Sequence, residues 1–213
     1  QVDGDGGMED TAVTDNSVVT VTLNRDRKVY LTNTPGVICQ IVVGGTTTKF
    51  FTLNDAVRYA QENLGGKATI EMLVDYLIPE TDNVVLPVGS DLTFTTAVKT
   101  EGSDPNGRYY EGERATISRD PGNMGSFFTV AGNNGQNSTT LTIKNLAFDG
   151  KKLANGTIDG GGIYTKNCNV EVHDALFTNC VAQNGGGMFV EIGTKSNNIY
   201  PASPEGTYLT VTN

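Results

Sequence analysis

The chain has 213 residues, 37% of them hydrophobic and 18% charged, which is the composition of a globular protein and fits one large domain or a domain with a smaller one attached. The net charge is −9 and the sequence contains no basic cluster, which argues against a nucleic-acid partner, because binding to phosphates needs several Lys or Arg on one face. No apolar run approaches the roughly 18 residues that cross a bilayer, so we expect no membrane insertion within this chain.

The N-terminal quarter of the chain divides into a polar segment and a β-rich segment. Residues 1–16 are acidic and glycine-rich, and we interpret them as a linker or a frayed terminus. Residues 17–51 are expected to form a β-rich lead-in, because short apolar and threonine-rich runs alternate there with turn residues. The strands predicted in it are at residues 18–23, 28–31, 37–43 and 46–52.

One helix is predicted after this lead-in, near residues 54–64. Apolar residues recur there at helical spacing, Thr52 or Asn54 can cap the first turn, and Gly65-Gly66 can end the helix. A single amphipathic helix ahead of repeated strands is expected to cover the open end of their stack, where apolar core and unpaired edges would otherwise be exposed.

Short strands and turns alternate from the helix to residue 213. The predicted strands before the repeat are at residues 68–74, 76–78, 84–86, 92–95, 115–119 and 126–130. A polar, turn-rich excursion at residues 99–113 interrupts them, and a second one follows at residues 191–205. Loops of this kind are where binding residues concentrate.

The strongest pattern is a unit that occurs twice between residues 140 and 189. LTIKNLAF, which begins at Leu141, and VEVHDALF, which begins at Val170, lie 29 residues apart, and each is followed by a glycine-rich run, GGGIY or GGGMF. YLTVT restarts the unit at Leu209 and stops within it, so we expect the chain to be a fragment of a longer protein. Self-similarity at this period indicates a solenoid, with successive units stacked in register.

Strand alternation within this unit assigns its two faces. Leu141 and Val170 are expected to point inward, and Lys144 and His173 outward. The Asx residues that follow each strand are expected at one corner, where they tolerate left-handed backbone. The glycines are expected at the opposite bend, where positive φ is needed.

These motifs, TLTIKNLAFDG, IDGGGIY, VEVHDALFTNC and NGGGMF, resemble those of the pectate-lyase-like superfamily, and in particular the repeats of bacterial surface proteins such as the chlamydial polymorphic outer-membrane proteins. The resemblance implies an all-β fold, a right-handed parallel β-helix over residues 52–213 with the helix near 54–64 as its N-terminal cap. The F-x-x-N half of the family motif is imperfect here, whereas the Gly-Gly-apolar half is well kept.

The resemblance implies a secreted or cell-wall-anchored bacterial surface protein, a non-enzymatic adhesin or stalk that binds a glycan or a host surface protein. The alternatives are a polysaccharide lyase or glycoside hydrolase with its site outside this fragment, or an inert spacer. The motifs N-T-D, D-D, G-H-G and R-I-K of a galacturonan hydrolase are absent, so we expect no enzymatic activity from this chain. We expect a monomer without cofactor or metal.

The candidate binding residues fall into two groups. The first comprises Tyr109, Tyr110 and Tyr200, aromatic residues of the two polar excursions that could contact a carbohydrate. The second comprises Lys144, Glu171 and His173, which the strand pattern places on one outward face. His173 is the only histidine of the chain, and its alternative interpretation is a solvent-facing strand residue.

Two aspartates and the cysteines are further candidates for a functional or a structural role. Asp149 and Asp159 each precede a glycine and are expected to be corner residues rather than catalytic acids. The chain has three cysteines without metal-ligand spacing. Cys168 and Cys180 could form a disulfide if adjacent units bring them together, or they could be small buried apolar residues.

Overall fold

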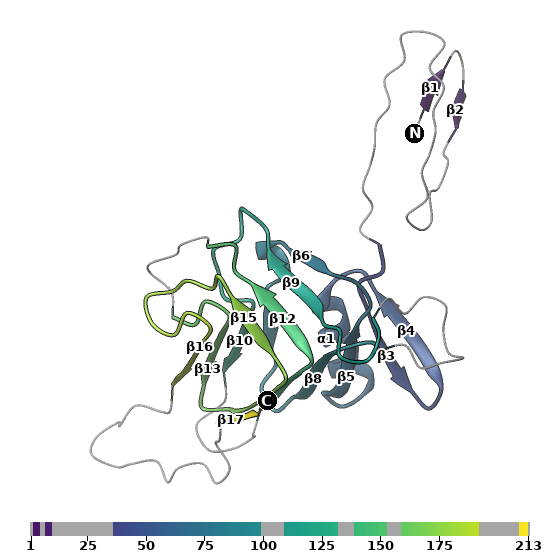
Figure 1. Cartoon of the computed structure of the whole chain (residues 1–213). Helices are drawn as coiled ribbons and strands as arrows, with labels where there is room; N and C mark the ends of the chain where they lie inside the picture. The colour runs from purple at the N-terminus through teal and green to yellow at the C-terminus, as the bar shows by residue number, and fades with distance from the viewer. Residues whose placement is uncertain are drawn as a thin grey trace, which may run out of the picture. The chain divides into compact units, whose positions relative to one another are not determined.

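A computed structural model of the chain (Figure 1) describes residues 2–4, 7–9, 36–98, 109–131, 139–152, 159–191 and 209–212. The chain divides into two compact units, residues 1–36 and 37–213. In the first unit, β1 (Val2–Gly4) pairs antiparallel with β2 (Gly7–Glu9). The strands predicted at residues 18–23 and 28–31 lie outside the described residues.

Three separate sheets form the second unit (Figure 1). The first sheet has seven strands in the order β17-β14-β11-β8-β5-β3-β4, and the other two have four strands each, in the orders β15-β12-β9-β6 and β16-β13-β10-β7. The strands of the first sheet are β3 (Cys39–Val43), β4 (Thr46–Phe50), β5 (Lys67–Met72), β8 (Asp91–Thr96), β11 (Thr140–Lys144), β14 (Asn169–His173) and β17 (Leu209–Thr212). Those of the second are β6 (Tyr76–Ile78), β9 (Ala115–Arg119), β12 (Leu146–Asp149) and β15 (Leu176–Thr178). Those of the third are β7 (Val84–Leu86), β10 (Phe128–Ala131), β13 (Ile163–Lys166) and β16 (Met188–Glu191).

The predicted fold class, an all-β right-handed parallel β-helix, is wrong. In the second unit the described residues form one mixed and two parallel sheets with a single α-helix, and no closed solenoid is found among them. The mixed character arises where β3 pairs antiparallel with both β4 and β5. Gly44 and Gly45 both have positive φ, so a two-residue turn reverses the chain at once, and such a hairpin can only be antiparallel.

The predicted register of the repeat is confirmed. Leu141 pairs with Val170, Phe148 with Phe177, and Val170 with Leu209, each in parallel. From β5 onward the described chain visits the three sheets in the same order in successive units, so each complete unit adds one strand to every sheet. Equivalent residues therefore lie beside one another across the sheets.

The predicted alternation is also confirmed, with one exception. Leu141, Ile143 and Val170 are fully buried, whereas Lys144 is exposed. Thr142, which the same alternation places on the outward side with Lys144, is only 5% exposed. The rule of alternation states which side of the sheet a residue faces, and it does not state whether other parts of the chain cover that side.

Aromatic rings fill the space inside the stacked units. Phe148 lies at the centre of this cluster and stacks on Phe177 with ring centroids 4.9 Å apart and planes inclined by 11°. It also contacts Phe127 and Phe128 at 5.7 and 5.8 Å, and Phe128 meets Phe94 edge-on at 4.7 Å. Phe148 is thus a fully buried core residue, and its counterpart Phe177 is partly buried and packs against the core.

The predicted helix is present as α1 (Leu53–Asn63), with Thr52 as its N-cap. Its apolar stripe, Leu53, Ala56, Val57 and Ala60, is buried. The buried carboxylate of Asp82, at the end of the short 3₁₀ helix η1 (Glu80–Asp82), accepts hydrogen bonds from the main-chain N–H groups of Leu53 (2.8 Å) and Asn54 (3.0 Å). These are two of the donors that a helix N-terminus leaves unpaired, and they attract a negative charge.

The corners and bends behave as predicted. Asn145 and Asp174, which follow β11 and β14, have φ of 47° and 49°. At the glycine bends, Gly160 and Gly185 have positive φ. Gly162 is required for a different reason, because a Cβ on it would collide with the carbonyl oxygen of Gly187 and the ring of Phe177.

Replacing Asp82 is expected to destabilise the fold. Asp82→Ala leaves two helix N–H groups and the hydroxyl of Tyr76, which donates to the same carboxylate at 2.9 Å, without their acceptor. We expect a loss of about 3 kcal/mol in the free energy of unfolding, measured by urea denaturation. Glu80→Ala, at an exposed position of the same 3₁₀ helix, is the control and should change stability by less than about 0.5 kcal/mol. Equal stability of the two variants would show that Asp82 does not hold the helix.

Replacing Gly162 tests the close approach of successive bends. Gly162→Ala places a methyl group against backbone atoms, which cannot rotate away, so we expect a loss of about 1–3 kcal/mol in the same assay. Gly122→Ala is the matched control, since its Cβ would make only an ordinary contact with Asp120. A Gly162→Ala protein as stable as the control would contradict the bend geometry.

Candidate functional site

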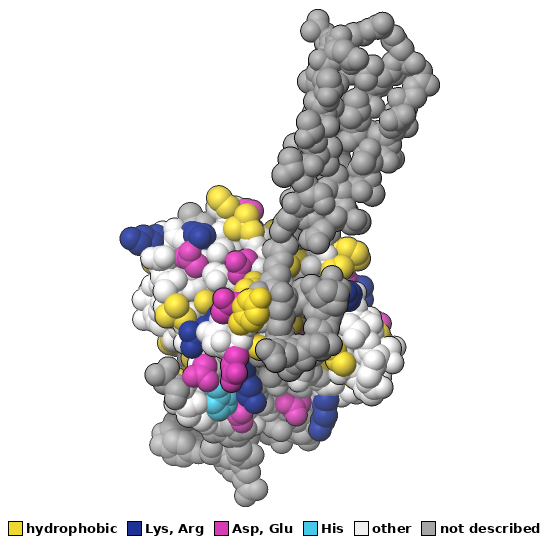
Figure 2. All heavy atoms as spheres, turned by 45° about the vertical axis from the view of Figure 1, so that its right-hand side comes forward, with side chains coloured by type: hydrophobic (Ala, Val, Ile, Leu, Met, Phe, Trp, Pro, Cys, Tyr) yellow, Lys and Arg dark blue, Asp and Glu magenta, His cyan; other side chains and the backbone are white. Residues whose placement is uncertain are grey.

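The structure brings Lys144, Glu171 and His173 together on the outward face of the seven-stranded sheet. Lys144 and His173 are direct partners on β11 and β14. The His173 ring lies between Thr212 and Glu171, with Nδ1 2.6 Å from the threonine Oγ1 and Nε2 3.4 Å from the carboxylate. Figure 2 shows the histidine side chain with acidic and basic side chains around it. The arrangement offers hydrogen-bonding groups of both charges on one face.

The predicted tyrosines lie elsewhere. The Tyr109 hydroxyl donates to Asp75 at 2.9 Å, and its half-buried side chain packs against the core. Tyr110 is 63% exposed, and its main-chain N–H donates to Glu113 at 2.8 Å. Of this pair, Tyr110 alone therefore presents most of its ring to solvent. Tyr200 lies outside the described residues.

The carboxylates of Asp149 and Asp159 are both hydrogen-bonded to nearby residues of the turns. Asp149 accepts hydrogen bonds from Asn179 and from the main chain of Lys151, and the Lys151 ammonium lies 2.7 Å away. Asp159 accepts from Asn184 at 2.8 Å in the next unit. These contacts confirm that both aspartates are corner residues.

Cys168 and Cys180 are free thiols, so the structure contains no disulfide between them. Cys168 is buried, with its sulfur 3.5 Å from the carbonyl oxygen of Val130. Burial raises the pKa of both thiols. Within the described part of the chain, no group of three or more His, Cys, Asp or Glu residues is arranged to hold a metal ion.

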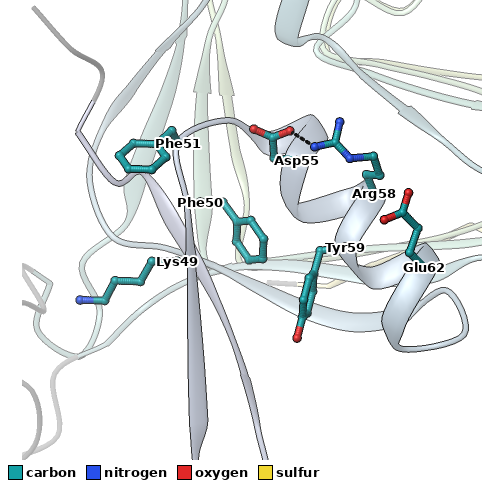
Figure 3. Close-up of a pocket in the computed structure, with 7 residues that line it drawn as sticks. All are labelled: Lys49, Phe50, Phe51, Asp55, Arg58, Tyr59 and Glu62. Atoms are coloured by element: carbon teal, nitrogen blue, oxygen red, sulfur yellow. Dashed lines mark hydrogen bonds and ion pairs between the residues drawn. The ribbon is translucent and has the colours of Figure 1, made fainter.

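A pocket that the sequence analysis did not predict lies between α1 and the end of β4 (Figure 3). Its volume is about 280 Å³, close to the lower limit for small-molecule sites. β4 and the residue after it contribute Lys49, Phe50 and Phe51. The helix contributes Asp55, Arg58, Tyr59 and Glu62.

Helical spacing explains why these four helix residues share one face. Positions 55, 58, 59 and 62 are separated by three, four and seven residues, which places them on the side of α1 away from its buried stripe. The buried stripe packs the helix onto the sheets, and so turns the polar side toward the end of β4. The pocket is therefore a consequence of how the helix docks.

Aromatic rings form the apolar part of this pocket. Phe50 is buried and meets the Tyr59 ring at 5.3 Å with an interplanar angle of 55°. Phe51 is 52% exposed, which is unusual for so large an apolar side chain beside a helix N-terminus. Figure 3 shows Phe51 and Lys49 on the strand side of the opening and the charged helix residues on the other side.

Charged groups of both signs line the rim of the pocket. Arg58 donates to Asp55 at 2.6 Å, so these two charges largely offset each other. Lys49 on the strand side and Glu62 on the helix side also line the pocket, and the Lys49 ammonium points away from the helix (Figure 3). An aromatic floor with such a rim suits a ligand that has apolar faces and a periphery of hydroxyl groups.

One signal in the sequence indicates an aromatic residue that points away from the core beside this pocket. Two adjacent phenylalanines directly before a helix cap cannot both face the core, because successive strand residues point to opposite sides. One of them was therefore expected to point away from the core, next to the helix.

Comparison of the chain with family models, with curated proteins and with solved structures gives no match. Among the described residues, no helix is both long enough and apolar enough to cross a membrane.

The Asp149 corner gives a pH-dependent prediction. The hydrogen bond from Lys151 is the main cause that lowers the pKa of Asp149 to about 2, and Asn179 adds to it. A depressed folded-state pKa means that this contact stabilises the protein fully above about pH 4 and that the contribution is lost as the pH falls toward 2. NMR titration of the carboxyl group should give a midpoint near 2, and Asn179→Ala should raise it. A midpoint near 4 in the unmodified protein would contradict the contact.

Proposed function

We propose that the chain is part of a secreted or wall-anchored bacterial surface protein that acts as a non-enzymatic adhesin and binds glycans. The observation that carries this proposal is the pocket between α1 and β4, where aromatic rings and charged groups of both signs converge. The likeness of the repeated motifs to those of bacterial surface proteins supports the cellular location.

The stacking of the units is also compatible with a stalk, which would hold the adhesin's binding site away from the cell surface. Each complete unit adds one strand to all three sheets, so a longer stack of such units extends by about 4.8 Å per unit. The inward residues build the core, and the outward residues are free to vary. A rigid support of this kind can hold a binding pocket at its end without any catalytic group.

The pocket residues are expected to determine glycan binding. Immobilised glycans are probed with the full chain, and Phe51→Ala and Tyr59→Ala are each expected to reduce binding at least about tenfold, because an aromatic contact at the centre of a site contributes most of its affinity. Thermal unfolding of each variant shows whether the fold is kept.

A control variant and a variant at a rival site make this experiment decisive. Leu77→Ala removes an exposed apolar side chain on β6 and should leave binding unchanged. Tyr110→Ala tests the exposed tyrosine predicted from the sequence. Loss of binding with Tyr110→Ala alone would move the site away from the pocket, and a chain that binds no glycan would overturn the adhesin proposal.

A further inference from the structure

A second aromatic surface lies on the outward face of the four-stranded sheet β16-β13-β10-β7. One row of side chains crosses this sheet from strand to strand in direct register: Val85, Thr129, Tyr164 and Phe189. Their inward neighbours Val84, Phe128 and Ile163 are fully buried, which establishes that the row faces away from the core. Val85 is 62% exposed, and Thr129, Tyr164 and Phe189 are half-buried.

The two aromatic rings of this row are parallel. The Tyr164 and Phe189 centroids are 6.0 Å apart, and their planes differ by 11°. β16 is the outermost strand of this sheet among the described residues, and both rings keep part of their surface exposed on its outward side. Parallel rings on the outward face of the sheet present apolar surfaces of a fixed orientation.

A hydrogen-bonded network beside the rings joins Tyr164, Lys166 and Glu191. Glu191 accepts a hydrogen bond from the Tyr164 hydroxyl at 2.8 Å and one from the Lys166 ammonium at 2.7 Å. The bond to Glu191 is the main cause that raises the pKa of Tyr164 to about 12, and the bond from Lys166 is the main cause that lowers the pKa of Glu191. The carboxylate therefore stays ionised and the phenol stays protonated at neutral pH.

Counted over the described residues, this network leaves hydrogen-bonding capacity unused. An ionised carboxylate offers about four acceptor positions, and an ammonium group has three donors. Glu191 and Lys166 use part of this capacity on each other and keep 26% and 40% of their side chains exposed. A ligand can therefore bond to both groups while it lies against the rings.

We propose that Tyr164, Phe189, Lys166 and Glu191 form a second glycan contact, which binds a neutral pyranose of an oligosaccharide lying along the row. This inference rests on the proposed adhesin function and names a surface separate from the α1 pocket. The apolar face of the sugar lies against the outward sides of the Tyr164 and Phe189 rings, and its hydroxyl groups bond to the Glu191 carboxylate and the Lys166 ammonium. Uncharged sugars are preferred, because an acidic one would bring a second negative charge to Glu191.

Isothermal titration calorimetry of the full chain tests this contact, with cello-, chito- and galacturono-oligosaccharides as probes. Phe189→Ala and Tyr164→Ala are each expected to weaken binding of the neutral probes about tenfold. Phe189→Tyr and Tyr164→Phe, which keep the rings, are expected to bind within about threefold of the unmodified chain. The acidic probe is expected to bind more weakly than the neutral ones.

The outcomes separate this contact from the adhesin proposal. Loss of binding with Phe51→Ala but unchanged binding with Phe189→Ala and Tyr164→Ala would overturn the second contact and leave the adhesin proposal intact. Equal loss in the alanine and ring-retaining variants would also overturn it, since the ring would then not matter. Absence of binding to any probe by the unmodified chain, together with an empty glycan array, would overturn both.

Discussion

Parallel pairing of equivalent residues in successive units is the constraint from which most of this structure follows. When Leu141 pairs with Val170, the residues that follow them as far as Asp149 and Thr178 are paired at the same offset, and Phe148 must stack on Phe177. A shift of one residue would exchange the two faces of each strand. It would bring Lys144 and His173, which face outward on β11 and β14, into the core. The corner residues and the outward row of β11 and β14 take their positions from this register, whereas the third sheet has a register of its own, in which Ile163 pairs with Met188.

Contacts at the bends keep the units at that register. Arg119 is 2% exposed and reaches the carbonyl oxygens of Asn123 and Gly125 in its own unit and of Gly161 in the following one. Its guanidinium also lies over the Phe127 ring, 4.6 Å from the centroid. Burial lowers the pKa of this group. A buried arginine bonded to carbonyl groups contributes geometry rather than large stability, because its desolvation offsets much of the gain.

The N-terminal end of the stack depends on a different contact. Asp82 binds the first turn of α1 and the hydroxyl of Tyr76, and thereby ties the helix to the unit that contains η1. With the apolar stripe of the helix facing inward, its opposite side can only face the end of β4 and solvent. The aromatic pocket thus exists because a buried carboxylate and an apolar stripe together orient one short helix.

Local patterns determined a large part of this protein. The positions of the helix and of the strands after residue 36, the register of the repeat and the conformation at Asn145 and Asp174 could be predicted, because each depends on residues adjacent in the sequence or on a repeated spacing. The grouping of Lys144, Glu171 and His173 could also be predicted, since it follows from the register.

Only the tertiary structure decided how these parts combine. Three features depend on segments that meet only in the folded chain. They are the antiparallel pairing of β3 with β5, the burial of Thr142 and the arrangement as three separate sheets. The pocket joins Phe51 to Glu62 through the docking of α1, and the Tyr164–Phe189 surface joins residues 25 positions apart. Sequence patterns state which side of an element a residue occupies. Which other element faces that side is decided by long-range packing, so the surfaces proposed to bind glycans became visible only in the folded protein.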